Sequence, residues 1–349
     1  MLVQKIVFLT TGNPGYSRSW VYYVGLKQQN KNVDFFLIDE NKLIKSFKTI
    51  KNQTTRDCIF VVMSPSHYLV PLVRLFLGKK IILDAGWSLF EGTIVARKKI
   101  GFLFYNLIKV YLIDLFASTI ARVVLLESKT QRDYYSNLLL TDKDKCLVLY
   151  TGLDETTFYP NESLAVPADL FKNGKIVLFR GKANDEAGLK TLAEATLLLK
   201  NEPITFCIFS PGIKDNLVFS ENTVIERNYI KSKGDLAKIF QASFLILGQM
   251  SSHIRLERTI PHKAFEAAFS GKPYLTSRAG GILEVFEEDK EVICFAGGDP
   301  KDLAKKIKLL INHPTLSLDL SLNIKAKYNH LCSQKVLTEL FIEIVKQRF

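Results

Sequence analysis

Short runs of Val, Ile, Leu and Phe alternate along the chain with longer segments in which apolar residues recur every three or four positions. One series of short runs extends from KIVFLT at residues 5–10 to CLVLY at 146–150, and a second from KIVLFRG at 175–181 to EVICF at 291–295. Continuous apolar runs predict strands covered by helices on both faces, and regular alternation with helices predicts parallel sheets. We therefore expect an α/β protein with two doubly wound, Rossmann-like sheets.

A polar, turn-rich segment at residues 151–174 separates the two series. A chain of 349 residues exceeds the usual size of one core. We predict domains at 1–160 and 161–330, and a C-terminal helix within 331–349 that packs back toward the first domain. Because open parallel sheets bind ligands beyond the carboxyl ends of their strands, we expect the site in a cleft between the domains.

The segment at residues 101–126 is the most apolar of the helical stretches. Its polar residues, spaced every three to five positions, predict a helix with one polar stripe: Asn106, Lys109, Asp114, Ser118 and Arg122. Each of its charged residues costs roughly 2.5–3.5 kcal/mol near a bilayer centre, which argues against a membrane-spanning helix. Two interpretations stay open. The helix is buried against its sheet, or it contacts a membrane surface with help from the ARKK sequence at 96–99.

The charge of the chain favours some classes of binding partner over others. The net charge is +12, and residues 1–160 hold 21 Lys and Arg against 13 Asp and Glu. Such an excess suits nucleic acid, phosphorylated metabolites or an anionic membrane. The basic residues are spread out and not interleaved with aromatic residues, which disfavours nucleic acid.

The cysteines and the N-terminal residues indicate the cellular compartment in which we expect the protein. Five widely spaced cysteines, Cys58, Cys146, Cys207, Cys294 and Cys332, predict buried free thiols in a reducing compartment. The first residues do not resemble a secretory signal, so we expect a cytoplasmic protein. No Cys or His pair has zinc spacing, and the Asp142-x-Asp144 pair is typical of an exposed turn. We therefore predict no metal site.

The most informative candidate site is the predicted helix in RTIPHKAFEAAFSGKP, residues 258–273. Its apolar positions form one stripe, and Lys263 and Glu266 point away from that stripe. One interpretation is a solvated Lys263–Glu266 pair. The other is a ligand site, in which the helix N-terminus, Lys263 and His262 hold a diphosphate while Glu266 accepts both hydroxyls of the attached ribose.

Three further groups of residues follow predicted strands. Arg180, Gly181 and Lys182 would place two cations where a diphosphate leaves, although a solvated basic loop is the alternative. Gly280 and Gly281 permit a tight turn and close backbone approach. The third group consists of Asp84, His67, His253, Arg255 and Glu257. Asp84 could act as a base or orient the acceptor, and the others could contact ligand. The alternative is that these side chains only form hydrogen bonds within their own loops.

The sequence TTGNPGYSRSW at residues 10–20 contains Gly15 in a loop typical of phosphate or sugar binding. It lacks the glycine spacing of a dinucleotide-binding loop, and GxxxxGK[ST] occurs nowhere in the chain. Both observations disfavour dehydrogenase and ATP-hydrolysing functions.

Taken in order, VLFRGKANDEAGLKTLAEA, VIERNYIKSKGDLAKIFQASFLIL and IPHKAFEAAFSGKPYLTSRAGGILEVF resemble GT-B glycosyltransferases of the family 4 type. LLESKTQRDYY and VLYTGLDETTFYP extend the resemblance over about residues 122–344. The resemblance implies an acceptor-binding first domain and a second domain that binds a nucleotide sugar, usually with retention and without metal. On this pattern Glu266 holds the ribose and Lys182 the diphosphate, beside the loop at Gly280 and Gly281.

The chain departs from the family pattern at several positions. Lys182 replaces an arginine, Ala187 stands where a basic residue is usual, and Arg258 where an acid is usual, with Glu257 one residue away. A histidine common after the later strands of the first domain is absent from LDAGWS at 83–88.

We expect a cytoplasmic glycosyltransferase that uses a UDP or GDP sugar as substrate, needs no cofactor and acts on a glycan or lipid-linked acceptor. Contact with an anionic membrane stays open. The alternatives are a nucleotide-sugar epimerase of the same fold and a catalytically degenerate partner subunit, which the departures at Ala187 and Arg258 suggest.

Overall fold

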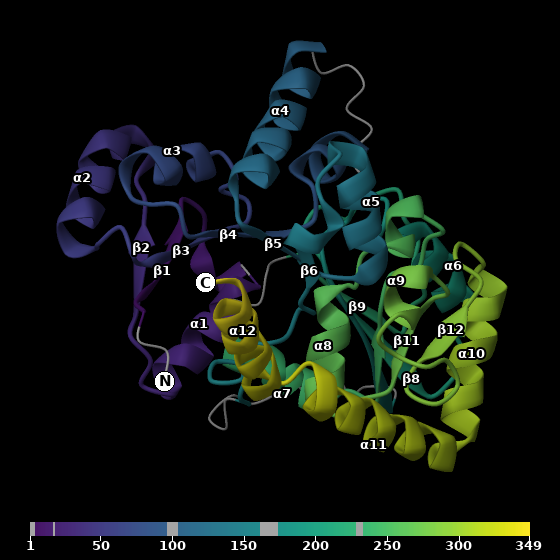
Figure 1. Cartoon of the computed structure of the whole chain (residues 1–349). Coiled ribbons are helices and arrows are strands. Elements are labelled where there is room, and N and C mark those ends of the chain that lie inside the picture. The colour runs from purple at the N-terminus through teal and green to yellow at the C-terminus, as the bar shows by residue number, and fades with distance from the viewer. Residues whose placement is uncertain (1–3, 17, 96–103, 161–173, 228–232) are drawn as a thin grey trace. The chain divides into compact units, whose positions relative to one another are not determined.

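The computed structural model describes residues 4–16, 18–95, 104–160, 174–227 and 233–349. The chain divides into two compact units, unit 1 (residues 1–152 and 334–349) and unit 2 (residues 153–333). Each unit contains a six-stranded parallel sheet with helices packed on it (Figure 1). The predicted α/β class with two sheets is confirmed.

The sheet of unit 1 has the strand order β2-β1-β3-β4-β5-β6. Its strands are β1 (Ile6–Thr10), β2 (Val33–Leu37), β3 (Ile59–Met63), β4 (Ile81–Gly86), β5 (Val123–Leu126) and β6 (Cys146–Val148). Its helices are α1 (Ser19–Gln28), α2 (Leu43–Gln53), α3 (Leu69–Phe76), α4 (Phe104–Ile120), α5 (Lys129–Leu139) and α12 (Gln334–Arg348). Helices α2 to α5 cover one face and α1 with α12 the other, each over its own apolar cluster (Figure 1).

The sheet of unit 2 has the strand order β12-β11-β10-β7-β8-β9. Its strands are β7 (Lys175–Arg180), β8 (Ile204–Phe209), β9 (Thr223–Glu226), β10 (Leu245–Leu247), β11 (Tyr274–Ser277) and β12 (Ile293–Phe295). Its helices are α6 (Leu189–Leu198), α7 (Lys233–Ala242), α8 (His262–Phe269), α9 (Gly280–Leu283), α10 (Pro300–Asn312) and α11 (Pro314–Leu331). The chain winds outward from β7 to β9 and then returns to β10 on the other side, so β7 and β10 flank the topological switch point.

Helix α12 closes unit 1 although it is the last element of the chain. The ring of Phe341 stacks on Tyr22 of α1 with centroids 4.9 Å apart. Gly25 lets the two helices approach closely, because a Cβ there would come 2.0 Å from the Thr338 hydroxyl oxygen. The first sheet therefore shares one of its apolar clusters with residues from the far end of the sequence.

Helix α4 reverses the predicted arrangement of its polar residues. Asp114 and Ser118, expected on a polar stripe, are fully buried, whereas Leu112 and Phe116 are exposed. Asp114 lies inside because it accepts hydrogen bonds from neighbouring loops. The ARKK sequence at 96–99 lies outside the described residues. Within the described parts of the chain, none of the helices combines the length and apolarity needed to cross a bilayer.

The five cysteines are all buried and unpaired in disulfides, as predicted.

Candidate functional site

The predicted site residues of unit 2 gather at the switch point. Strand β7 ends at Arg180, and the loops after β7, β10 and β11 carry most of the other candidates. These loops are tightly joined, because Gly188 has φ +66° and a Cβ there would lie 2.6 Å from the backbone of Met250. Helix α8 begins at the same edge, at His262.

Glu266 of α8 is buried and ion-paired. Its side chain is 3% exposed, and its Oε2 accepts a hydrogen bond from Arg180 Nε at 2.9 Å. A second guanidinium nitrogen of Arg180 bonds Oε1, and His262 Nδ1 lies 3.2 Å from the same oxygen. Burial by itself would raise the pKa of Glu266, but Arg180 and His262 lower this pKa to about 2. The carboxylate is therefore ionised at neutral pH.

Lys263 is buried next to this pair. Its Nζ donates to the carbonyl of Gly248 at 3.2 Å and to Oε1 of Gln249 at 3.3 Å, and it lies 4.0 Å from the ring centre of Phe179. Burial lowers the pKa of Lys263 well below its ordinary value, Arg180 lowers it further, and Glu266 opposes the shift. The interpretation as a solvated Lys263–Glu266 pair is wrong, because α8 is enclosed on both sides rather than on its apolar stripe alone.

Gly181 gives Lys263 its room. It adopts φ +153°, and a Cβ there would come 3.3 Å from Lys263 Nζ. Lys182, the next residue, is exposed. The end of β7 thus places one cation, Arg180, in the ion pair with Glu266, and the loop after it places a second, Lys182, in solvent.

The segment before α8 packs against the glycine turn. Glu257 accepts a hydrogen bond from the backbone N–H of Gly280 at 2.8 Å, at the start of α9. A Cβ on Gly281 would lie 2.3 Å from the carbonyl oxygen of Thr259, so only glycine fits there. Arg258 is partly buried in the same segment.

Arg255 and His253 complete this wall. Arg255 pairs with the buried Glu186 at 2.9 Å. His253 Nδ1 accepts a hydrogen bond from the backbone N–H of Arg255 at 3.2 Å. His253 thereby caps the N-terminus of the 3-10 helix Ile254–Glu257. Ala187, the departure from the family pattern, is 1% exposed, and its N–H donates to the Asn184 side chain.

Sequence reasoning missed three residues of this cluster: Gln249, Glu186 and Asn184. Gln249 is the second residue after β10, a position at the carboxyl end of a strand that could have pointed to it. Glu186 bonds Arg255 across 69 positions of sequence, so no local pattern indicated the pair.

The candidates of unit 1 serve its own interior. Asp84 in β4 is fully buried, lies 2.9 Å from Arg18 Nε, and accepts hydrogen bonds from the hydroxyls of Ser19 and Tyr22. These contacts fix the start of α1 at the carboxyl edge of the sheet.

His67 is also fully buried, and its Nδ1 lies 2.7 Å from Asp114 of α4. Gly15, predicted in a loop, lies in the short 3-10 helix Pro14–Tyr16, where its N–H donates to Oδ1 of Asn13 at 2.9 Å. Among the described residues, no group of three or more His, Cys, Asp or Glu side chains is placed to hold a metal ion.

Residues 190–338 match a family described as glycosyl transferase-like. The fold matches a structure of Anabaena HepE in complex with UDP-glucose, with a TM-score of 0.68, 14% identity, and 98% of this chain and 99% of that chain covered. The chain has the GT-B fold. The chain also resembles sucrose-phosphate synthase from Thermosynechococcus elongatus (TM-score 0.72, 13% identity, 99% of this chain and 98% of that chain covered).

A glycosyltransferase from Rickettsia africae ESF-5 matches the chain with a TM-score of 0.65 and 14% identity, covering 99% of each chain. A comparison with curated proteins found no match. The family match includes α8, Glu257 and the glycine turn, while Arg180 and Lys182 lie shortly before its first residue.

Proposed function

We propose that this protein is a glycosyltransferase that moves a sugar from a nucleoside diphosphate sugar to a hydroxyl of a glycan or lipid-linked acceptor, in the synthesis of a surface polysaccharide or glycoconjugate. The observation that carries the proposal is the buried Arg180–Glu266 pair with Lys263 at the N-terminus of α8. The complex of HepE with UDP-glucose favours UDP over GDP as the nucleotide of the donor. We further propose retention of anomeric configuration and no requirement for a bound metal.

In this proposal Glu266 receives the ribose. A carboxylate offers about four lone-pair positions. Arg180 fills two of them and His262 approaches a third. The His262 side chain is 50% exposed, so it can turn outward when the ribose hydroxyls arrive, whereas Arg180 stays as the counter-ion.

The cations and the helix end receive the diphosphate. The first N–H groups of α8 lack partners within the helix and favour an anion. Lys182 is free in solvent to approach the same anion, and Lys263 supplies a third positive group once protonated. As the bond from the anomeric carbon to the diphosphate oxygen breaks, these groups stabilise the charge on the leaving group.

Unit 1 would present the acceptor. Asp84 has no exposed surface, and we propose that it acts by positioning Arg18, Ser19 and Tyr22. The acceptor hydroxyl then replaces the diphosphate oxygen at the anomeric carbon, and its proton is released to solvent or to a nearby base.

The test is incubation of the purified protein with a panel of UDP and GDP sugars, with and without candidate acceptors, followed by product analysis. We expect nucleoside diphosphate release that depends on acceptor, unchanged by a chelator, with the donor's anomeric configuration in the product. A change of donor stereochemistry without acceptor would instead indicate an epimerase. Donor binding without any turnover, together with no effect of Lys182→Ala on glycan output in cells, would indicate a partner subunit.

A further inference from the structure

Helix α4 turns apolar side chains toward solvent. Tyr105, Ile108, Leu112 and Phe116 are 68%, 44%, 38% and 54% exposed. Their spacing of three, four and four places them on one side of the helix. In Figure 1 the N-terminal end of α4 extends beyond the other helices of its layer. A contiguous apolar surface of this kind on a globular protein marks an interaction site.

The rotation of α4 about its axis is fixed, so this side cannot turn inward. Asp114, on the opposite side, lies 2.7 Å from His67 Nδ1. The same carboxylate accepts from the hydroxyl of Ser88 at 2.7 Å and the N–H of Phe90 at 2.9 Å. Rotation would break these buried hydrogen bonds. Leaving buried polar groups without partners costs more free energy than leaving these apolar side chains exposed to water.

Helix α3 continues the apolar surface. Tyr68 and Pro71 form the other wall of a groove along α4 that includes Ile108, Leu112 and Phe116. Leu75 lies one turn beyond Pro71 on the same side of α3 and is 72% exposed. The surface thus spans two helices.

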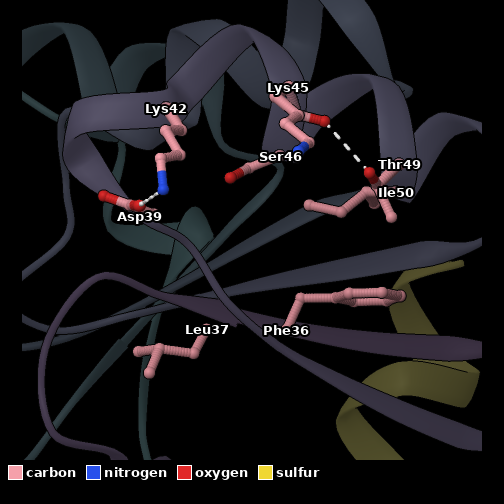
Figure 2. A pocket seen from close by; sticks show the side chains of 8 residues that line it. All are labelled: Phe36, Leu37, Asp39, Lys42, Lys45, Ser46, Thr49 and Ile50. Atoms are coloured by element: carbon pink, nitrogen blue, oxygen red, sulfur yellow. Dashed lines mark hydrogen bonds and ion pairs between the residues drawn. The ribbon is translucent and has the colours of Figure 1, made fainter.

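The neighbouring surface has an excess of positive charge. Residues 39–80 contain three acids, Asp39, Glu40 and Asp57, and eight basic residues: Lys42, Lys45, Lys48, Lys51, Arg56, Arg74, Lys79 and Lys80. The four lysines of the α2 region are exposed, and α2 packs on α3 through Phe47 and Phe76, with ring centres 5.8 Å apart. Figure 2 shows Lys42 and Lys45 on the α2 side of a pocket, opposite Phe36 and Leu37 of β2.

We propose that this α2–α3–α4 face of unit 1 docks on an anionic lipid bilayer, with the α4 side chains entering the interface and the α2 lysines on the headgroup phosphates. Apolar and aromatic side chains beside lysines are the composition of interfacial membrane-binding helices. Protein–protein interface cores are instead depleted of lysine. The inference rests on the proposed function only in its purpose, which is to bring the enzyme to a lipid-linked acceptor.

The test is co-sedimentation of the full chain with vesicles of phosphatidylcholine alone or mixed with phosphatidylglycerol. We expect binding to the mixed vesicles that weakens as salt is added. The double variant Leu112→Gln, Phe116→Gln should bind about 20-fold more weakly, because it removes two of the apolar side chains that gain from burial in the bilayer interface. The matched control is Leu318→Gln, Leu322→Gln on α11 of unit 2, where both side chains are 58% and 60% exposed; it should bind as the wild type does.

A second variant tests the contribution of the α2 lysines. Lys45→Glu, Lys48→Glu should abolish the preference for phosphatidylglycerol while leaving the melting temperature unchanged, because both side chains are exposed. Equal binding to both kinds of vesicle by the wild-type chain would overturn the proposal. So would undiminished binding by the α4 variant, or a dimer that sediments as such and dissociates in that variant.

Sugar transfer to a water-soluble acceptor separates this inference from the proposed function. Transfer without vesicle binding would remove the docking face alone. Vesicle binding without transfer would remove the proposed function and leave the docking face in place.

Discussion

Replacement of Glu266 by glutamine tests the centre of the site through its energetics. The Arg180 guanidinium and His262 hold the pKa of Glu266 at about 2, against its ordinary 4.5. With about 1.4 kcal/mol for each pKa unit, the ionised carboxylate contributes about 3 kcal/mol to the free energy of unfolding at neutral pH. Glu266→Gln should remove this contribution and leave Arg180 without its counter-ion.

The pH dependence gives the sign of the effect. Because the folded-state pKa lies below the unfolded one, the stabilisation is complete above pH 4.5 and is lost as the pH falls toward 2. Urea unfolding followed by circular dichroism should show the variant less stable by about 3 kcal/mol at pH 7, or lower in melting temperature by roughly 6–12 °C. At pH 3 the difference between the two proteins should shrink to under half of its value at pH 7.

Glu194→Gln is the matched control. Glu194 is 48% exposed and lies 3.9 Å from Lys190, so its loss should change stability by less than about 0.5 kcal/mol. A Glu266→Gln protein as stable as the wild type at pH 7, or one whose deficit persists unchanged at pH 3, would refute the reasoning.

Three other predictions concern the same edge of unit 2. Lys182→Ala should lower kcat/KM by roughly 10²–10³-fold in steady-state transfer assays with no change in melting temperature, since the side chain is exposed, and normal kinetics would contradict its role at the diphosphate. Gly281→Ala places a Cβ against the carbonyl of Thr259 and should cost about 1–3 kcal/mol in thermal unfolding; an unchanged melting temperature would show that the turn can relax. A bound diphosphate should raise the lowered pKa of Lys263, so donor binding should take up a proton and weaken as the pH rises; calorimetry in buffers of different ionisation enthalpy would detect that proton or its absence.

The strands could be predicted because each is an unbroken run of apolar residues. Such a run is visible in the sequence itself, without knowledge of any tertiary contact. The orientation of α4 could not. Its sequence contains both apolar and polar residues on several sides, and the buried side is decided by Asp114 bonding His67, a residue 47 positions away. A local pattern assumes that polar residues face water, and one buried carboxylate with three partners reverses that assumption.

Sequence reasoning located much of the candidate site but not its contacts. Glu266, Lys263 and Arg180 were each singled out from their own segments, and the parallel sheet brings β7 and α8 to one edge. That Glu266 pairs with Arg180 rather than Lys263 depends on a separation of 86 residues. The roles of these residues in donor binding and catalysis stay predictions.

The placement of α12 has a consequence for synthesis of the protein. Residues 153–333 form an uninterrupted stretch that can condense as soon as it leaves the ribosome, whereas the sheet made first lacks Leu337 and Phe341 until the final residues emerge. The unit that is translated first is thus the unit that is completed last, and a nascent chain stalled before residue 334 would display an uncovered apolar face to chaperones.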